Sequence, residues 1–291
     1  GGAGEGRGGE GRAMIEQARR DVAGLAGDAG GEVTFTSGGT EANNLALAPG
    51  VHRLGPAGKA PRRATHLLVS AIEHPSVMEG HRFAADAVRI IPALESGVVD
   101  LTALKALLKE LGPEDCALVS VMLANNETGI IQPVREIAAL VHEFGGFVHS
   151  DAIQAAGKLK IDLAELGIDL VTLSAHKIGG PQGVGALIAA PGIALGGKLM
   201  RGGGQEGGRR AGTENLPGIA GFGAAAKAAA AGIAGMEEIA TWRDRIADGM
   251  RKVAPGVEIV GEDEERLPNT LCVMVPGRSA ESLVIAFDLA G

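Results

Sequence analysis

A chain of 291 residues with 45% hydrophobic residues is long enough to bury a large core. Its formal net charge is −8 and its basic residues form no long cluster, which argues against nucleic acid or a membrane surface as partner. Without Cys-x-x-Cys or His-Glu-x-x-His, we expect no structural zinc or protease-type metal site. No apolar run approaches membrane-spanning length and no signal peptide is recognisable, so we expect a soluble, cytoplasmic protein.

The order of predicted elements indicates an α/β fold. Residues 1–12 are rich in glycine and lack apolar periodicity, so we expect a flexible lead before a helix at 13–25. Strands are then predicted at 32–36, 66–70, 88–92, 117–123, 147–150, 169–174 and 184–189, and helices at 41–48, 77–85, 101–111 and 134–144. This alternation is typical of a mostly parallel sheet flanked by helices, whose ligands bind at the carboxyl ends of the strands.

The last part of the chain changes character. An alanine-rich helix is predicted at 218–231 and a second helical stretch at 236–253. Short strands at 257–260 and 270–275 and a helix from about 280 follow them. We therefore expect a large domain over 13–235 and an incomplete small α+β domain over 236–291.

Lys177 follows the apolar, β-prone run 170–173 and precedes Gly179, Gly180 and Pro181. A lysine at the carboxyl end of a buried strand is expected to be partly desolvated, which favours the free amine that forms a Schiff base with an aldehyde. The alternative is a surface lysine at the opening of a hairpin.

The segment 36–40 joins a predicted strand to a helix through Gly38 and Gly39. Backbone N–H groups at such a helix start can bind a phosphate, with the helix dipole and the hydroxyl of Thr40 assisting. The alternative is a plain N-cap by Ser37 or Thr40.

Asp151 and His74 also follow predicted strands. A carboxylate at Asp151 can keep a pyridine nitrogen protonated, or it can cap the next helix. The imidazole of His74 can stack on a flat ring and move protons, or it can be structural. A phosphate loop, an aromatic stacker, an acid and Lys177, all at strand ends, together predict a pyridoxal phosphate site.

Six stretches extend this pattern: FTSGGTEANN at 35–44, EH at 73–74, ANNETGIIQP at 124–133, HSDAIQ at 149–154, SAHKIGGPQG at 174–183 and RRAGTEN at 209–215. With them the chain resembles the cysteine desulfurases, in the class V aminotransferase group of fold-type I pyridoxal phosphate enzymes, from about residue 13 to the end. The resemblance implies conversion of L-cysteine to L-alanine, with sulfur left on a protein cysteine as a persulfide. It also implies a homodimer with shared active sites that supplies iron–sulfur scaffold proteins or other sulfur acceptors.

The resemblance assigns the central roles to three residues. Lys177 is expected to hold the cofactor as a Schiff base and later to move the substrate Cα proton. Asp151 is expected to pair with the pyridine nitrogen, and His74 to stack on the ring and take part in proton transfer.

The resemblance also assigns the surrounding contacts. Gln154 is expected to hydrogen-bond the ring hydroxyl, and Asn126 to lie beside the ring and the substrate carboxylate. The residues expected to hold the phosphate are Gly39, Thr40, Ser174 and His176. Thr213 is expected to reach the phosphate of the neighbouring subunit.

The chain departs from the family pattern in several places. It ends before the Ser/Gly-rich loop that carries the nucleophilic cysteine and before the arginine for the substrate carboxylate, and it lacks the amino-terminal strand. Gly207 stands where the family usually has an arginine. Cys116 and Cys272 lie in apolar, strand-like runs and are expected to be buried core thiols. We therefore expect a fragment that binds cofactor without completing desulfuration.

Two alternatives remain open. A selenocysteine lyase or another class V aminotransferase would share the Lys177 site and differ in its substrate contacts. A non-catalytic sulfur-transfer binding protein would use its surface instead and would have no need of the cofactor residues.

Overall fold

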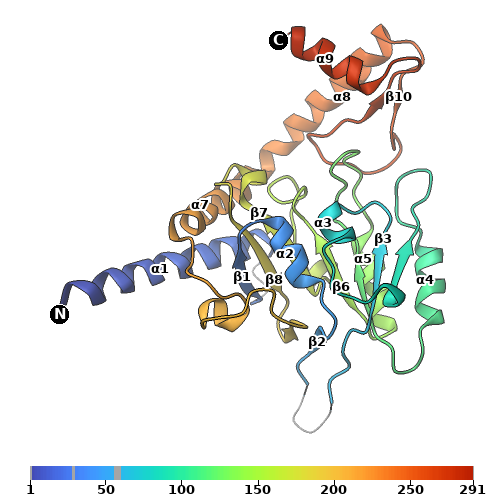
Figure 1. The fold of residues 1–291 in the computed structure, drawn as a ribbon. Helices are drawn as coiled ribbons and strands as arrows, with labels where there is room; N and C mark the ends of the chain where they lie inside the picture. The colour runs from blue at the N-terminus through green and yellow to red at the C-terminus, as the bar shows by residue number, and fades with distance from the viewer. Residues whose placement is uncertain (1, 28–29, 56–59, 291) are drawn as a thin grey trace.

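The computed structural model describes residues 2–27, 30–55 and 60–290, with only the backbone described for residues 2–8. Its centre is a seven-stranded sheet in the order β1-β8-β7-β6-β5-β3-β4 (Figure 1). The strands span Glu32–Thr36 (β1), His66–Ser70 (β3), Val88–Ile91 (β4), Ala117–Ser120 (β5), Phe147–Asp151 (β6), Leu170–Ser174 (β7) and Gly185–Ala189 (β8). Strands β4, β3, β5, β6 and β7 are parallel, whereas β8 is antiparallel to both β7 and β1. The predicted α/β fold with a mostly parallel sheet is confirmed.

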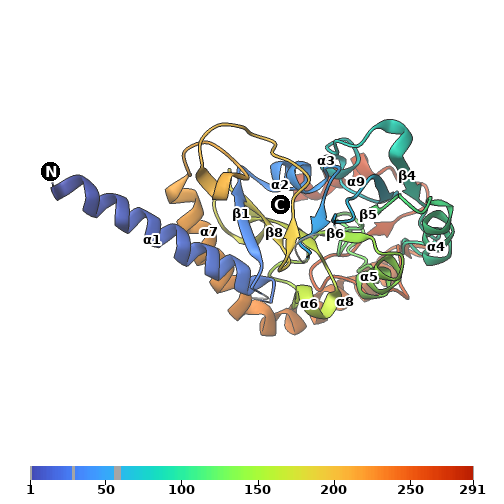
Figure 2. The same cartoon turned by 90° about the horizontal axis from the view of Figure 1, so that it is seen from below.

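Both faces of the sheet are covered by helices, so its central strands are buried and most of their side chains are apolar. In β3, Leu67 and Val69 belong to one hydrophobic cluster and Leu68 to the other, as alternating side chains require. Figure 2 shows the helices on the two sides of the sheet. They are α2 (Gly39–Ala46) and α3 (Pro75–Met78) on one face, and α1 (Gly2–Leu25), α4 (Leu101–Glu110), α5 (Val134–Glu143), α6 (Leu163–Leu166) and α7 (Leu216–Gly232) on the other.

Most predicted elements lie within a few residues of the observed ones, but the helix predicted at 77–85 is wrong. The chain forms only the single turn α3, followed by a 3₁₀ turn at Ala85–Ala87 (η1). A Cβ on Gly80 would lie 2.0 Å from Asn44 Nδ2, so tight packing against α2 determines the path here instead of helix propensity. The two-residue strands β2 (His52–Arg53) and β9 (Ile193–Ala194) are too short to be detected by periodicity.

The last part of the chain lies at the carboxyl edge of the sheet (Figure 1). It contains helix α8 (Met236–Val253), the strand pair β10 (Glu258–Ile259) and β11 (Val273–Met274), and helix α9 (Ala280–Ala290). Helix α8 continues from α7 through the 3₁₀ turn Ile233–Gly235 (η4). The predicted elements of this part are all present, and its boundary at residue 236 stays a prediction.

Helix α1 begins at Gly2, which differs from the irregular lead expected for residues 1–12. The second half of α1 packs along α7, with Ala18 and Val22 buried. Gly223 of α7 lies against α1 so closely that a Cβ there would be 2.6 Å from Ala18 Cα. This packing holds the second half of α1 in place, and the glycine-rich first half of α1 continues the same helical path.

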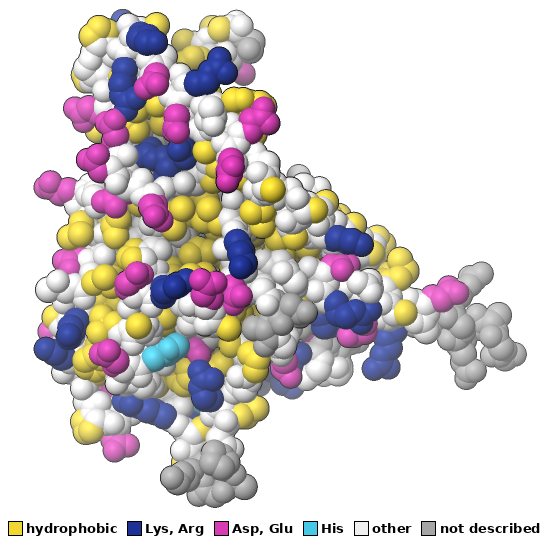
Figure 3. All heavy atoms as spheres, turned by 180° about the vertical axis from the view of Figure 1, so that it is seen from behind, with side chains coloured by type: hydrophobic (Ala, Val, Ile, Leu, Met, Phe, Trp, Pro, Cys, Tyr) yellow, Lys and Arg dark blue, Asp and Glu magenta, His cyan; other side chains and the backbone are white. Residues whose placement is uncertain are grey.

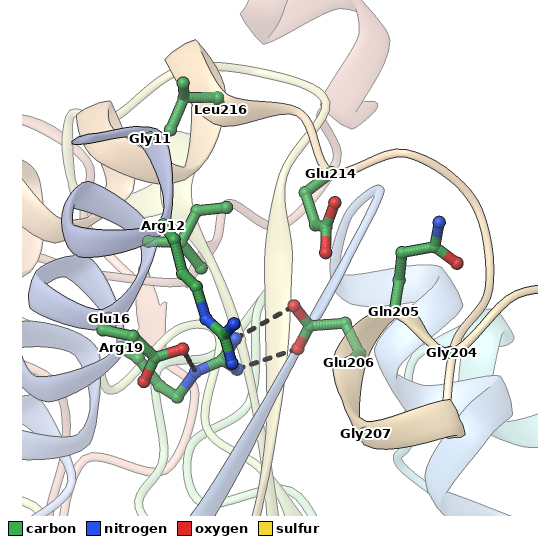
Figure 4. A pocket seen from close by; sticks show the side chains of 11 residues that line it. Gly11, Arg12, Glu16, Arg19, Gly204, Gln205, Glu206, Gly207, Glu214 and Leu216 are labelled. Carbon is green, nitrogen blue, oxygen red and sulfur yellow. Dashed lines mark hydrogen bonds and ion pairs between the residues drawn. The ribbon is translucent and has the colours of Figure 1, made fainter. Parts of the chain in front are cut away.

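A partly buried ion pair joins α1 to β1 and to the 3₁₀ turn Gln205–Gly208 (η3). Arg19 donates to both carboxylate oxygens of Glu206, at 2.8 and 3.0 Å (Figure 4). Its guanidinium also lies 5.0 Å from the centre of the Phe35 ring. Glu206 also accepts the backbone N–H of Phe35 at 2.9 Å. Glu206 and Gly207 adopt left-handed conformations with φ of 50° and 60°, which a glycine at 207 accommodates readily.

One helical run among the described residues, Leu216–Val253, is long and apolar enough to cross a membrane by length and composition. The expectation that no run approaches this length was therefore wrong. Alanine and glycine supply most of the apolar residues in α7, and Ile219, Phe222 and Ala226 are buried. Packing of α7 against α1 therefore explains part of the apolar character of this helical run.

Charges of both signs are interspersed on the face seen from behind in Figure 3, with apolar surface between them. On this face, lysine and arginine side chains gather in no broad basic patch. The view agrees with the absence of a long basic cluster in the sequence.

Replacing Gly223 by alanine is expected to lower the free energy of unfolding by about 1–3 kcal/mol, because the new methyl group would push α7 away from α1. Gly232 offers the matched control: it belongs to the same helix, and a Cβ there meets no atom within 4 Å. Urea unfolding of Gly223→Ala and Gly232→Ala measures both effects. Equal stability of the two variants would contradict close packing of α1 on α7.

Candidate active site

Six strands place their carboxyl ends at one edge of the sheet. Strands β3, β4, β5, β6 and β7 are parallel, and β1 runs in the same direction as β7 because both are antiparallel to β8. A cavity of about 280 Å³ opens at this edge. Its lining residues are Gly39, Thr40, His74, Ser76, Met122, Ala124, Asn126, Asp151, Ile153, Gln154, Ser174, His176 and Lys177. All the site residues predicted from the sequence lie here except Thr213.

The start of α2 forms one wall of the cavity. Gly38 is the N-cap of this helix and no side chain caps it, so the alternative of a plain N-cap by Ser37 or Thr40 is wrong. Gly39 packs closely against Ile153: a Cβ here would lie 2.2 Å from Ile153 Cδ1, so a larger residue would require this side chain to move. The first N–H groups of a helix have no intrahelical acceptor, and without a capping side chain they can bind an anion such as a phosphate.

Lys177 lies in the 3₁₀ turn Ala175–Ile178 (η2), directly after β7. The lysine lines the cavity, but it is exposed, which corrects the expectation of partial desolvation. The reason is that the turn carries it beyond the end of the strand, to the open side of the cavity. Ser174 is 2% exposed at the end of β7, and its Oγ lies 2.9 Å from His176 Nδ1.

Asp151 ends β6 and is 5% exposed. Burial raises the pKa of its carboxyl, while hydrogen bonds from the Ile153 N–H (2.9 Å) and Asn43 Nδ2 (2.8 Å), and the nearby His74, oppose this shift. Among the described residues, no lysine or arginine forms an ion pair with it. A buried carboxylate on a cavity wall suits a ligand that presents a protonated ring nitrogen.

His74 caps a helix and also lines the cavity, so its structural role is confirmed, while stacking on a ring and proton transfer stay predictions. Its Nδ1 accepts the N–H of Ser76 at 3.1 Å and lies 2.8 Å from Ser76 Oγ, which makes His74 the N-cap of α3. With Nδ1 engaged in this way, Nε2 is the ring nitrogen available to a ligand.

Local backbone contacts hold Asn126 and Gln154 in the cavity wall. Asn125 Oδ1 accepts the N–H groups of Glu127 and Thr128, both at 2.9 Å, and this turn presents Asn126. Lys158 Nζ donates to the carbonyl oxygen of Gln154 at 2.6 Å.

Thr213 lies apart from these residues, in a smaller cavity of about 100 Å³ together with Ser37 and Arg210. Arg210 donates to Glu41 at 2.8 Å and so connects this segment to α2. Within one chain, therefore, Thr213 does not join the main cavity. Its contact with a neighbouring subunit stays a prediction.

Sequence reasoning assigned no role to several residues that shape the site, above all Asn43 and Glu73. Both stand in stretches that carry the family resemblance, but each has a contact with a distant part of the chain, Asn43 with Asp151 and Glu73 with Met122. Glu73 Oε1 accepts Ser70 Oγ at 2.5 Å and the N–H of Met122 at 2.6 Å. Burial, and to a lesser extent the charge of Asp151, raises the pKa of Glu73 to about 8, so this carboxyl carries a proton at neutral pH.

Comparison with known proteins agrees with this geometry. The profile of the family described as "Aminotransferase class-V" matches residues 4–291. The chain is 39% identical to "Cysteine desulfurase IscS 1" of Archaeoglobus fulgidus, over 96% of this chain and 71% of that protein. It is 41% identical to "Cysteine desulfurase" of Cereibacter sphaeroides, over 97% of this chain and 72% of that protein.

Solved structures give the same result. The NifS-like protein from Rickettsia africae superposes with a TM-score of 0.86 at 34% identity, over 99% of this chain and 77% of that one. A structure described as "SspA in complex with cysteine" has a TM-score of 0.71 at 27% identity, over 98% of this chain and 77% of that one. These matches agree with the seven-stranded, mostly parallel sheet.

Glu73 predicts a specific dependence of stability on pH. Its folded pKa, about 8, lies above the ordinary value of 4.5, so the native state holds a proton that the unfolded state releases between these pH values. Stability from this group is complete below pH 4.5 and falls by up to about 1.4 kcal/mol per pH unit up to pH 8. Glu73→Gln, which cannot ionise, is expected to lose this slope. Urea unfolding of both proteins at several pH values measures it, and parallel curves would contradict the protonated carboxyl.

Proposed function

The chain belongs to the class V aminotransferase family, and on this premise we propose that its cavity is the site of a pyridoxal phosphate-dependent cysteine desulfurase. The reaction takes L-cysteine and a protein thiol to L-alanine and a protein persulfide. The C–S bond of the substrate breaks, an S–S bond forms on the acceptor, and the substrate β carbon is reduced while the acceptor thiol is oxidised. The observation that carries the proposal is the convergence of Lys177, a buried Asp151, His74 and an uncapped helix start on one cavity.

The residues present fit this cofactor. The start of α2, with Gly39 and Thr40, would hold the phosphate together with Ser174 and His176, and Asp151 would take the protonated ring nitrogen. When bound, pyridoxal phosphate supplies an aldehyde carbon and a ring that withdraws electrons from the substrate Cα.

The chain's own side chains would then act on the substrate. Lys177 would bind the aldehyde through Nζ and move the proton at Cα, and it lies on the open side of the cavity, where a substrate enters. His74 would pack on the ring and hold a proton at Nε2. Asn126 would orient the substrate carboxylate.

Neither cysteine of this sequence is placed to accept sulfur. Cys116 is 1% exposed at the amino end of β5, at the edge of the sheet opposite the cavity, and burial raises the pKa of its thiol. Cys272, expected to be buried, is only half-buried, and it lies beside the β10–β11 pair. The acceptor thiol would therefore come from residues outside this sequence or from a partner protein.

The choice of substrate rests on the relatives, whereas the assembly and the sulfur-acceptor partner rest on the family resemblance of the sequence motifs. The names of the proteins from Archaeoglobus fulgidus and Cereibacter sphaeroides state cysteine desulfurase activity, and one similar structure is described as a complex with cysteine. We propose L-cysteine as the substrate, a homodimer as the assembly and an iron–sulfur scaffold or other sulfur acceptor as the partner.

Adding pyridoxal phosphate to the purified chain is expected to produce a visible absorbance band that borohydride reduction removes, because the amine of Lys177 binds the aldehyde. Lys177→Ala is expected to lack the band, whereas Lys160→Ala, which changes an exposed lysine outside the cavity, is expected to retain it. A band of equal strength in Lys177→Ala would contradict the proposed site.

Incubation of the loaded chain with L-cysteine is expected to leave no persulfide on Cys116 or Cys272, since neither lines the cavity. Alkylation followed by peptide mass spectrometry detects such a persulfide. A persulfide on either cysteine would identify it as the acceptor and refute the assignment of the acceptor thiol to another segment or protein. Alanine release from L-cysteine and from L-selenocysteine, with an added thiol, distinguishes a desulfurase from a selenocysteine lyase.

A further inference from the structure

We propose that Asn43 is a positioning residue that holds the acid Asp151 and, through Ser76, the imidazole of His74 in one fixed arrangement. The inference rests on the proposed function in one respect only, the roles given to Asp151 and His74. Its evidence is a chain of buried hydrogen bonds whose direction is determined by the groups that form it.

Asn43 lies in α2 and is fully buried. Its Nδ2 donates to Asp151 Oδ2 at 2.8 Å and to Ser76 Oγ at 2.9 Å. Ser76 Oγ lies 2.8 Å from His74 Nδ1. One amide group therefore connects two side chains that come from different strand ends and face the same cavity.

The other end of the amide is also occupied. Asn43 Oδ1 accepts the hydroxyl of Thr172 at 2.5 Å. A hydroxyl has a single proton, so Thr172 Oγ1 must act as acceptor toward its other neighbour, His149 Nε2, at 3.3 Å. The remaining nitrogen of that ring, Nδ1, lies 2.8 Å from Ser120 Oγ and accepts from it.

Burial determines which groups in this series of hydrogen bonds carry protons. Thr172, His149 and Ser120 are all fully buried, and burial lowers the pKa of His149 to about 3, so its ring is neutral and carries a single N–H. The donors therefore run in one direction, from Ser120 through His149, Thr172 and Asn43 to the carboxylate of Asp151. Reversing the Asn43 amide would place its oxygen against this carboxylate, and it would leave Thr172 without an acceptor.

Two consequences follow for the site. Asp151 receives one donor on each oxygen, from Asn43 and from the Ile153 N–H, which fixes the plane of the carboxylate. The titratable groups around this network are Asp151, His74, His149 and, against Asp151, the protonated Glu73. His74 Nδ1 is an acceptor, so the neutral ring carries its proton on Nε2.

The first test needs no cofactor. Nitrogen NMR of the chain labelled with ¹⁵N-histidine, with signals assigned through His149→Gln and His74→Gln, reports the tautomer of each ring. We expect the Nε2–H tautomer at His149, with its ring neutral from pH 7 down to pH 5. An Nδ1–H tautomer at His149 would reverse the donor chain and overturn the inference.

The second test uses Thr172→Val, which removes the hydroxyl and keeps the shape, beside Thr172→Ser, which keeps the hydroxyl. We expect Thr172→Val to weaken pyridoxal phosphate binding at least tenfold and to shift the titration midpoint of the visible band by at least half a pH unit. Thr172→Ser is expected to stay within about twofold of the unsubstituted chain. Asn43→Asp, which places a second acceptor against Asp151, is expected to weaken binding still more than Thr172→Val.

Urea unfolding of each variant without cofactor separates positioning from stability. The two variants could lose stability equally while cofactor binding and the band midpoint stay unchanged in both. That result would show that the series of hydrogen bonds is only structural and would overturn the inference. Absence of a Lys177-dependent band in the unsubstituted chain would count against the proposed function, and the NMR result would still decide the inference.

Discussion

Asp151 is a carboxylate removed from water at the end of a central strand, and the arrangement of the surrounding site depends on this burial. Its location is set by β6, which lies between β5 and β7 and brings the carboxylate to the edge where six strands end. Removal of a charge from water is costly unless donors surround it. The Ile153 N–H and the Asn43 amide are those donors, and the cavity side is left for a cationic ligand.

The polar groups beneath the cavity form a layer between two apolar cores. Strand residues alternate between the clusters on the two faces, yet Ser120, His149 and Thr172 stand among them fully buried. Each has a hydrogen-bond partner within the layer, as buried polar groups require. The polar groups of this cavity wall already form hydrogen bonds with one another, so the wall is expected to change little when a ligand binds. Such a rigid wall suits a site that must hold a flat ring in one orientation.

Much of the fold could be predicted from the sequence because its signals are local. Strand 66–70 is a short apolar run and helix 134–143 has apolar residues at helical spacing, and both are found within one residue of their predicted ends. The helix predicted at 77–85 was wrong because contact of Gly80 with α2 outweighs helix propensity. The predicted desolvation of Lys177 was wrong because the turn after β7 carries the lysine to the open side of the cavity.

The sequence by itself determined which residue types follow each strand, and so the chemistry that can gather at one edge: Gly39 and Thr40, His74, Asp151, and Lys177. Only the tertiary structure decided that β8 lies antiparallel between β1 and β7, and that Asn43 joins Asp151 to Ser76. The reason is physical. Periodicity and turn residues report on neighbours within a few positions, whereas Asn43 and Asp151 are separated by 108 positions in the chain and meet only when the sheet forms.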